Sequence, residues 1–244
     1  MLVSFVIPAH DEELSLPQTL CAIRSAASEI GLEHEIVVAD DASTDRTAEV
    51  ARAGGARVVS HQRRQISATR NLGARAAKGD FLIFVDADTR VTAGAVRDAV
   101  EVLTNGAVGG GAMVRFDGWI PLYAKLLLAV LVWAFRLTKR CGGAFAFCTR
   151  EALERAGWWN ESVFAAEEIY FAKELKRLGD FVIIGPTVVT SGRKLRTHSG
   201  WEILGFFVRA AFGGRRFFAD RSKLPLWYAP RRTDPMRMDK DPLQ

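Results

Sequence analysis

The sequence predicts an α/β protein with a mostly parallel central sheet flanked by helices. In the first half of the chain, short apolar runs alternate with longer amphipathic segments, which is the pattern of strands joined by covering helices. The 244-residue chain is 49% hydrophobic, which is enough to bury a full core. Because no linker precedes residue 225, we expect a single domain at 1–225 and a basic tail at 226–244.

The first predicted elements are a strand, a helix and a second strand. The apolar run LVSFVIP at 2–8 predicts the first strand, and EIVVA at 35–39 predicts the second. Between them, apolar residues recur at helical spacing, and the polar residues 11–15 offer hydrogen-bonding groups for the start of that helix. The apolar positions of this helix are Leu16, Leu20, Ile23, Ala27 and Ile30.

The later elements are predicted in the same way. A second helix is expected to begin at Ser43 or Thr44, whose hydroxyls can cap it, and to end at Gly54 and Gly55. The remaining expected elements are a strand at 57–60, a helix at 65–78, a strand at 80–85, a helix at 92–103, a strand at 107–116 and a helix at 166–178.

The long apolar segment at 119–137 is too short to predict a membrane span. Its uninterrupted apolar core, Leu126 to Phe135, has ten residues, whereas a span needs about 20, and Lys125 and Arg136 bracket it. We expect a buried or interfacial helix here. The segment at 201–218 has the same mixture of aromatic, aliphatic and cationic residues, which is typical of a helix lying in a membrane surface.

The charge distribution is uneven. The net charge is +5, and residues 193–244 contain 12 Lys and Arg against 5 Asp and Glu. Such a region can approach phosphates or anionic lipid headgroups. The three cysteines show no paired motif, and the apolar N-terminal stretch ends at Pro8, which is too early for a secretory signal. We therefore expect a cytoplasmic protein, peripheral on the inner face of the membrane.

Acidic residues follow three of the predicted strands. The strand at 80–85 runs directly into Asp86 and Asp88, and the first two strands end in PAHDEE and DDASTD. The carboxyl ends of parallel strands share one edge of a sheet, where ligands bind. Clustered carboxylates repel one another unless a cation neutralises them, and hard oxygen ligands favour Mg²⁺ or Mn²⁺. This pattern suits a diphosphate substrate held together with a divalent metal.

Other uses of paired acids or nucleotide-binding strands fit less well. Haloacid-dehalogenase-like phosphatases place the acids after the first strand and have Thr or Val where this chain has Arg90. A dinucleotide-binding fold needs G-x-G-x-x-G after an early strand, and none is present. A nucleotidyltransferase would be expected to have a Gly-rich basic loop after the first strand, where this chain has PAHDEE.

Five segments in order resemble the family 2 glycosyltransferases, which are inverting enzymes with the GT-A nucleotide-diphospho-sugar transferase fold. The segments are VSFVIPAHDEE, EIVVADDASTDRTAEVA, ISATRNLGARAAKGDFLIFVDADTRV, GGAFAFCTREALERAGWWNES and AAEEIYFAKELKRLG. They cover roughly residues 1–180. The resemblance implies a nucleotide-binding half at 1–105 and an acceptor half at 106–225.

The resemblance also implies roles for individual residues. The implied nucleotide contacts are Pro8, Ala9, His10, Glu12, Asp40, Arg70, Asp86 and Ala87. The implied contacts to the donor sugar or diphosphate are Gly142, Gly143, Ala144, Arg193 and Arg196, with Lys194 beside the last two. The implied metal ligands are Asp86, Asp88 and His198. Glu168, with Glu167 beside it, takes the place of the family's catalytic base, although the family has Asp there and Glu is one methylene longer.

The function implied is the metal-dependent, inverting transfer of a sugar from a nucleotide diphosphate to an acceptor, with Mg²⁺ or Mn²⁺ as cofactor. We expect a nucleotide-diphospho-sugar donor, a hydroxyl or lipid-phosphate acceptor, peripheral membrane contact and no nucleic-acid partner. One alternative is a polyprenyl-phosphate sugar transferase, whose acceptor is already ionised and needs no base. An alternative of another class is a nucleotide-sugar-binding protein without turnover.

Overall fold

The computed structural model describes residues 1–125, 142–229, 232, 234 and 235. In the first half, the elements are β1 (Val3–Ala9), α1 (Leu16–Glu29), β2 (His34–Asp41), α2 (Thr47–Ala53), β3 (Arg57–His61), α3 (Ile66–Ala76), β4 (Phe81–Val85), β5 (Thr89–Arg90), α4 (Ala93–Thr104) and β6 (Gly109–Phe116). They are followed by β7 (Phe145–Thr149), α6 (Arg150–Arg155), α7 (Glu167–Leu175), β8 (Phe181–Thr190), α8 (Arg193–Thr197), α9 (Gly200–Phe218), a 3₁₀ turn (Arg221–Lys223) and α10 (Pro225–Tyr228).

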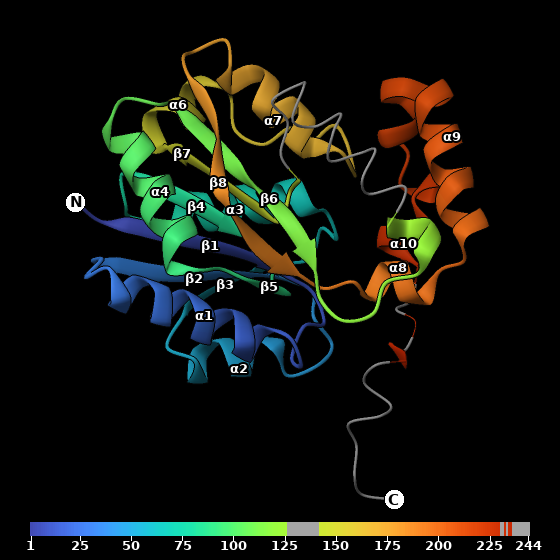
Figure 1. Cartoon of the computed structure of the whole chain (residues 1–244), viewed down its shortest axis with the longest axis horizontal. Coiled ribbons are helices and arrows are strands. Elements are labelled where there is room, and N and C mark those ends of the chain that lie inside the picture. Colours follow the sequence, from blue (N-terminus) through green and yellow to red (C-terminus); the bar gives the residue numbers. More distant parts are fainter. Residues whose placement is uncertain (126–141, 230–231, 233, 236–244) are drawn as a thin grey trace, which may run out of the picture.

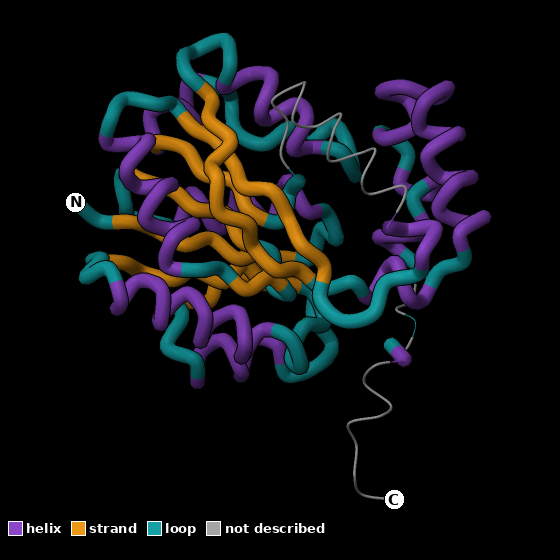
Figure 2. The backbone as a smooth tube through the Cα atoms, in the orientation of Figure 1, coloured by secondary structure: helices purple, strands orange, loops and turns teal. Residues whose placement is uncertain are grey.

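The strands form one sheet in the order β3-β2-β1-β4-β7-β6-β8-β5. Strands β3, β2, β1 and β4 are parallel, β7 runs antiparallel between β4 and β6, and β6 and β8 are parallel to each other. Helices pack on both faces of this sheet, and α8, α9 and α10 lie beyond the ends of β6 and β8 (Figures 1 and 2). The predicted α/β fold with a mostly parallel sheet is confirmed.

Each face of the sheet has its own core. Successive side chains of a strand point to opposite faces, so Phe5 and Ile7 of β1 pack with α1 and α4, whereas Val6 packs with α3, α6 and α7. Helix α3 lies very close to β1 at Gly73: a Cβ atom added there would stand 2.5 Å from Val6 Cγ1. This close packing holds α3 against β1, and the start of the same helix reaches the site.

Two strands in the second half are not predicted by the sequence pattern. Strand β7 is only five residues long, and the apolar run of β8 is interrupted by Gly185 and Pro186. Strand β8 makes an irregular register with β6 at this point, between Ala112 and Met113. The helix expected at 119–137 lies largely outside the described residues, which here end at Lys125.

The predicted basic tail is partly folded. Residues 225–228 form α10, and Asp234 is buried with 5% of its surface exposed. The described part of the segment 226–244 therefore packs against the domain.

Candidate active site

Two cavities meet at the carboxyl ends of β1 and β4. One, which we call the polar cavity, has a volume of about 720 Å³. Its walls come from the loop after β1, the loop after β2, the start of α3, the D-x-D residues, α8 and the C-terminal segment. The lining residues are Pro8, Ala9, His10, Asp11, Glu12, Asp41, Thr44, Asp45, Arg64, Gln65, Ile66, Thr69, Asp86, Ala87, Asp88, Arg193, Lys194, Thr197, His198, Pro225, Leu226, Trp227, Tyr228, Ala229 and Arg232.

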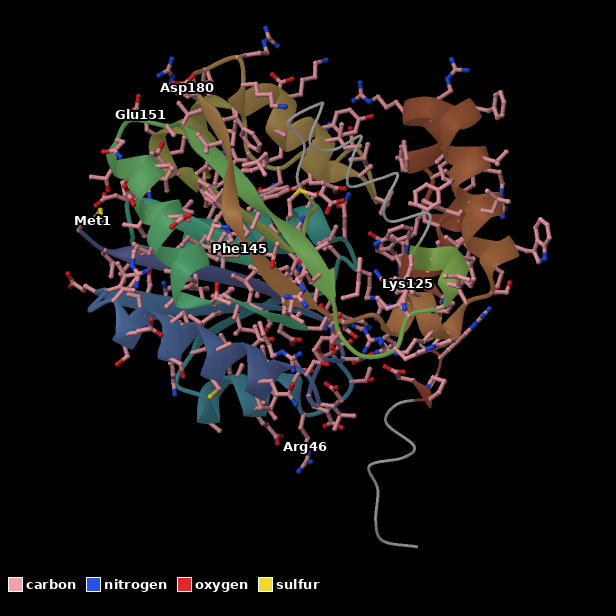
Figure 3. The ribbon with its side chains drawn as sticks, in the orientation of Figure 1. Met1, Arg46, Lys125, Phe145, Glu151 and Asp180 are labelled. Carbon is pink, nitrogen blue, oxygen red and sulfur yellow. The ribbon has the colours of Figure 1, made fainter. Side chains whose placement is uncertain are left out.

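The second, which we call the apolar cavity, has a volume of about 650 Å³ and lies on the other side of Asp86 and Asp88. Figure 3 shows Lys125, one of its lining residues, at the end of the molecule occupied by α8–α10, away from Glu151 and Asp180. Its apolar lining residues include Met113, Val114, Phe116, Ile120, Leu195, Ile203, Phe206, Phe207, Leu226 and Trp227. Its polar lining includes Arg70, Arg115, Glu167, Glu168, Arg193 and Lys194.

The loops after β1 and β2 are joined by hydrogen bonds. The backbone N–H of Asp11 donates to Ser43 Oγ at 2.9 Å, and the N–H of Thr44 donates to the Asp11 carboxylate at 2.7 Å. The N–H of Glu12 donates to Thr47 Oγ1 at 2.7 Å. Ser43 and Thr44 therefore do not cap α2 as predicted; the helix begins at Thr47, because these hydroxyl and amide groups hold the loop after β1.

Asp41 organises the start of α3. Its carboxylate accepts hydrogen bonds from the backbone N–H groups of Arg63, Arg64 and Gln65 at 2.7–2.9 Å, and from Thr69 Oγ1 at 2.8 Å. Asp41 lines the polar cavity, whereas Asp40, the predicted nucleotide contact, lies at the end of β2 outside the residues that line it. The role of Asp40 stays a prediction.

Asp86 and Asp88 stand between the two cavities and line both. Burial, together with repulsion from Glu12 and Asp86, raises the pKa of Asp88 to about 6. Arg193 partly offsets this charge, since its Nη2 lies 3.3 Å from Glu12 Oε1 and 4.0 Å from Asp88 Oδ2. A carboxylate with a raised pKa gains stability when a cation binds beside it.

The D-x-D acids fit a hard divalent cation. Their oxygen donors and the repulsion among them suit Mg²⁺ or Mn²⁺. Within the described residues, no three His, Cys, Asp or Glu side chains are grouped to hold a metal by themselves. A metal here would thus need oxygens from a ligand or from water. His198, the predicted third ligand, lines the polar cavity, and its Nδ1 lies 3.1 Å from the carbonyl of Lys194.

Arg70 joins the D-x-D motif to the predicted base pair. Its side chain is 1% exposed, its Nη1 donates to Glu167 Oε1 at 2.6 Å, and its Nη2 donates to Asp86 Oδ1 at 2.9 Å and to the Gly143 carbonyl at 3.0 Å. The guanidinium also lies over the ring of Trp159 at 4.5 Å. Arg70 lines the apolar cavity and does not line the polar one. Its role as a nucleotide contact stays a prediction.

The two glutamates at the start of α7 differ in their surroundings. Glu167 is buried and paired with Arg70. Glu168 lines the apolar cavity, and burial together with repulsion from Glu167 raises its pKa to about 8. A carboxylate with a pKa in this range is suited to general acid or base chemistry near neutral pH. Glu167 also lines the apolar cavity but is held by its ion pair with Arg70, and the role of Glu168 as the base stays a prediction.

The other predicted donor contacts have three different placements. Gly142, Gly143 and Ala144 line the apolar cavity beside Arg70. Arg193 lines both cavities, as does Lys194. Arg196 was predicted at the diphosphate and lines neither cavity: its side chain is 4% exposed and forms ion pairs with Asp117 and Asp234. The structure therefore does not bring Arg196 to the site, because its guanidinium is paired with both carboxylates, and its contact with the diphosphate stays a prediction.

The C-terminal segment contributes cavity residues that were not predicted from the sequence. Leu226 and Trp227 line both cavities, and Tyr228 and Arg232 line the polar one. The aromatic pair in PLWY, within a basic stretch, was the available signal.

Comparisons with known proteins identify the family. Residues 4–155 match the model of the family described as glycosyl transferase family 2. The chain is 33% identical, over 53% of its length and 43% of the relative, to the undecaprenyl-phosphate 4-deoxy-4-formamido-L-arabinose transferase of Edwardsiella ictaluri. It is 40% identical over 99 residues to the same-named protein of Pseudomonas aeruginosa, covering 36% of this chain and 28% of the relative. The chain thus spans less than half the length of these relatives.

Solved structures share the fold. The mannosyltransferase PcManGT from Pyrobaculum calidifontis, in complex with GDP-Man and Mn²⁺, has a TM-score of 0.66 at 20% identity, covering 87% of this chain and 62% of that one. The glucosyl-3-phosphoglycerate synthase of Mycobacterium tuberculosis, in complex with Mn²⁺, UDP and glucosyl-3-phosphoglycerate, has a TM-score of 0.58 at 24% identity, covering 90% and 81%. These structural neighbours bind a nucleotide or nucleotide sugar together with Mn²⁺.

Proposed function

The chain belongs to glycosyl transferase family 2, and on that premise we propose that it transfers a sugar from a nucleotide-diphosphate donor to a lipid-phosphate acceptor. The observation that carries the proposal is the junction of the two cavities. Asp86, Asp88, Arg193 and Lys194 line both the polar cavity and the apolar cavity. A donor in the first and an acceptor in the second would therefore meet at the groups that handle phosphate charge.

Asp86 and Asp88 would hold a divalent metal together with diphosphate oxygens. When bound, the ion would stabilise the negative charge of the departing nucleoside diphosphate. Arg193 and Lys194 would contribute further positive charge on the same side. Arg70 would hold the Asp86 carboxylate in place through the 2.9 Å hydrogen bond from its Nη2.

The reaction is a single displacement at the anomeric carbon. An acceptor oxygen forms the new bond to this carbon as the bond to the diphosphate oxygen breaks, and the electron pair of that bond leaves with the nucleoside diphosphate. A hydroxyl acceptor would transfer its proton to Glu168, which faces the apolar cavity. A phosphate acceptor is already ionised and transfers no proton.

The composition of the apolar cavity supports a lipid-phosphate acceptor. Most of its walls are aliphatic or aromatic, which suits a hydrocarbon chain, while Arg193 and Lys194 offer cations to a phosphate at the junction. The names of the Edwardsiella and Pseudomonas relatives state that those proteins act on undecaprenyl phosphate. A hydroxyl acceptor is the second candidate, and Glu168 is the observation that favours it.

Helix α9 supports peripheral contact with a membrane. Ile203 and Phe206 line the apolar cavity, while Trp201 is 83% exposed and Phe212 is 90% exposed on the same helix. Arg209, like Arg215 and Arg216, is exposed there and can meet anionic headgroups. Among the described residues, no helix meets the length and apolarity that a membrane span requires.

A transfer assay tests the proposal. The purified chain is incubated with Mn²⁺ and UDP-, GDP- or dTDP-sugars, and with either a polyprenyl phosphate or the matching polyprenol. We expect one donor to yield a glycosylated polyprenyl phosphate, detected by mass spectrometry, and no product from the polyprenol. Product from the polyprenol alone would favour the hydroxyl candidate. Nucleotide-sugar binding without any transfer would favour a non-catalytic binding protein.

A further inference from the structure

The C-terminal segment forms one wall of the polar cavity. We call the described residues Leu224–Ala229, Arg232 and Asp234 the C-terminal strap. Of these, Trp227, Tyr228 and Arg232 line the polar cavity together with the loops after β1 and β2. The strap is thus placed where a nucleotide donor would be enclosed between it and the sheet edge.

Apolar contacts anchor the start of the strap. Leu224 is fully buried in a small core with Ala165, Phe206 and Phe217. The Tyr228 hydroxyl donates to the backbone carbonyl of Phe164 at 2.8 Å. These contacts fix α10 against α9 and the segment that precedes α7.

Ion pairs anchor its other end. Asp234, 5% exposed, accepts hydrogen bonds from Arg196 at 2.7 and 2.9 Å, and Arg196 also reaches Asp117 at 3.2 Å. Arg232 pairs with Glu202 at 2.6 Å. Because Arg196 follows Arg193 and Lys194 in α8, the Arg196–Asp234 pair ties the strap to the helix that carries the cations of the site.

Trp227 makes a direct contact with one of those cations. The Nζ atom of Lys194 lies 4.7 Å from the centre of the Trp227 ring, and both residues line both cavities. A cation over an aromatic face is attracted by the ring's quadrupole, which restricts the position of a flexible ammonium group. The negative charges of Asp88 and Asp86 also attract the Lys194 ammonium group.

We propose that the C-terminal strap is part of the donor site: Trp227 is a positioning residue that holds Lys194 toward the diphosphate, and the Arg196–Asp234 ion pair keeps the strap over the polar cavity. The inference rests on the proposed function in that it takes a nucleotide diphosphate as the ligand. It adds donor-binding residues outside the segment at 4–155 that matches the family model.

Substitution of Trp227 tests the positioning role. We expect Trp227→Ala to raise the KM for the nucleotide sugar and the Kd for UDP or GDP with Mn²⁺ by roughly tenfold, with a smaller change in kcat. Trp227→Phe keeps an aromatic face and should recover most of the affinity. The matched control is Trp158→Ala, which removes a similar pair, Arg75 over Trp158 at 4.6 Å, outside both cavities and should leave the Kd unchanged.

Substitution of Asp234 tests whether the Arg196–Asp234 ion pair holds the strap over the polar cavity. We expect Asp234→Asn to weaken nucleotide binding and to speed hydrogen–deuterium exchange in Pro225–Tyr228, and we expect UDP or GDP with Mn²⁺ to slow that exchange in the wild type. The control is Asp220→Asn, which weakens the exposed Asp220–Lys223 pair and keeps a residue that can cap the 3₁₀ turn.

The outcomes separate this inference from the proposed function. If the wild type binds none of UDP, GDP and dTDP with Mn²⁺, the proposed function fails. If the wild type binds one of them and both Trp227→Ala and Asp234→Asn bind it with unchanged Kd, the inference about the strap is wrong and the proposed function stands. Lower melting temperatures with an unchanged Kd would assign the strap a purely structural role.

Discussion

Replacing Arg70 by methionine would remove the cation that lies between buried Glu167 and partly exposed Asp86. Arg70 is 1% exposed and bonds Glu167 at 2.6 Å and Asp86 at 2.9 Å. Methionine keeps an unbranched, flexible side chain and has no charge, so the variant would leave both carboxylates without this partner. The Gly143 carbonyl would lose its 3.0 Å hydrogen bond from Arg70 as well.

The expected cost is large. Breaking a buried ion pair by removing one partner typically costs about 3–5 kcal/mol of unfolding free energy, because a charge is left buried without compensation. For a domain of this size, each kcal/mol lowers the melting temperature by about 2–4 °C. Arg70→Met should therefore melt roughly 6–20 °C below the wild type at pH 8.

The cost should depend on pH in a defined direction. In the wild type, burial already raises the pKa of Asp86, and the pKa of Glu168 is raised to about 8; loss of Arg70 raises both further. An acid whose folded pKa exceeds its unfolded pKa destabilises the protein above the folded pKa, and protonation relieves this as the pH falls. The difference in unfolding free energy between the wild type and Arg70→Met should thus become smaller as the pH falls from 8 to 5.

Thermal and urea unfolding at these two pH values measure the effect. The matched control is Arg155→Met, which breaks an exposed Arg155–Glu151 pair and should change stability by less than about 1 kcal/mol. A loss below 1 kcal/mol for Arg70→Met, or a gap that widens on acidification, would refute the assignment of Arg70 as the charge that balances Asp86 and Glu167.

The remaining predictions concern the site, the membrane surface and the core. Transfer to a hydroxyl acceptor should rise as the pH increases through about 8 and level off above it, because Glu168 must lose its proton. Glu168→Gln should abolish this transfer, whereas transfer to a phosphate acceptor should show neither the pH dependence nor the loss. Phe212→Glu should reduce co-sedimentation with anionic vesicles without changing nucleotide affinity, and unchanged sedimentation would remove α9 as the contact. Gly73→Ala should cost about 1–3 kcal/mol of unfolding free energy, because the new Cβ would meet Val6 Cγ1; an equally stable variant would contradict the close packing of α3 on β1.

The sequence predicted the parts of the fold that depend on local pattern. Strands β1 to β4 are apolar runs bounded by turns, and β4 leads directly into Asp86 and Asp88, so both the sheet edge and its acids could be recognised. Strand β7 is a five-residue run inserted antiparallel between β4 and β6, and such pairing depends on contacts distant in sequence. Nothing in FAFCT alone distinguishes it from a buried turn of helix.

The sequence predicted those features of the candidate site that depend only on the type of a residue and its place in the chain. Arg70 was expected on helix α3, but its pairing with Glu167, 97 residues later, is a property of the folded chain. Arg196 was expected at the diphosphate from the charge of its neighbourhood. The structure pairs it with Asp117 and Asp234, away from both cavities, whereas Arg193 pairs with Glu12 at the site; no sequence pattern shows which acids each of these cations will meet.

The central claim is that Asp86 and Asp88 hold a divalent metal and a nucleotide diphosphate at the junction of the two cavities. Calorimetric titration of the wild type and Asp88→Asn with UDP and with GDP, each in the presence and absence of Mn²⁺, tests it most directly. We predict that the wild type binds one nucleotide much more tightly with Mn²⁺ and that Asp88→Asn, which keeps the shape of the side chain, loses this dependence on the metal. Equal Mn²⁺-dependent affinity in the two proteins would contradict the account.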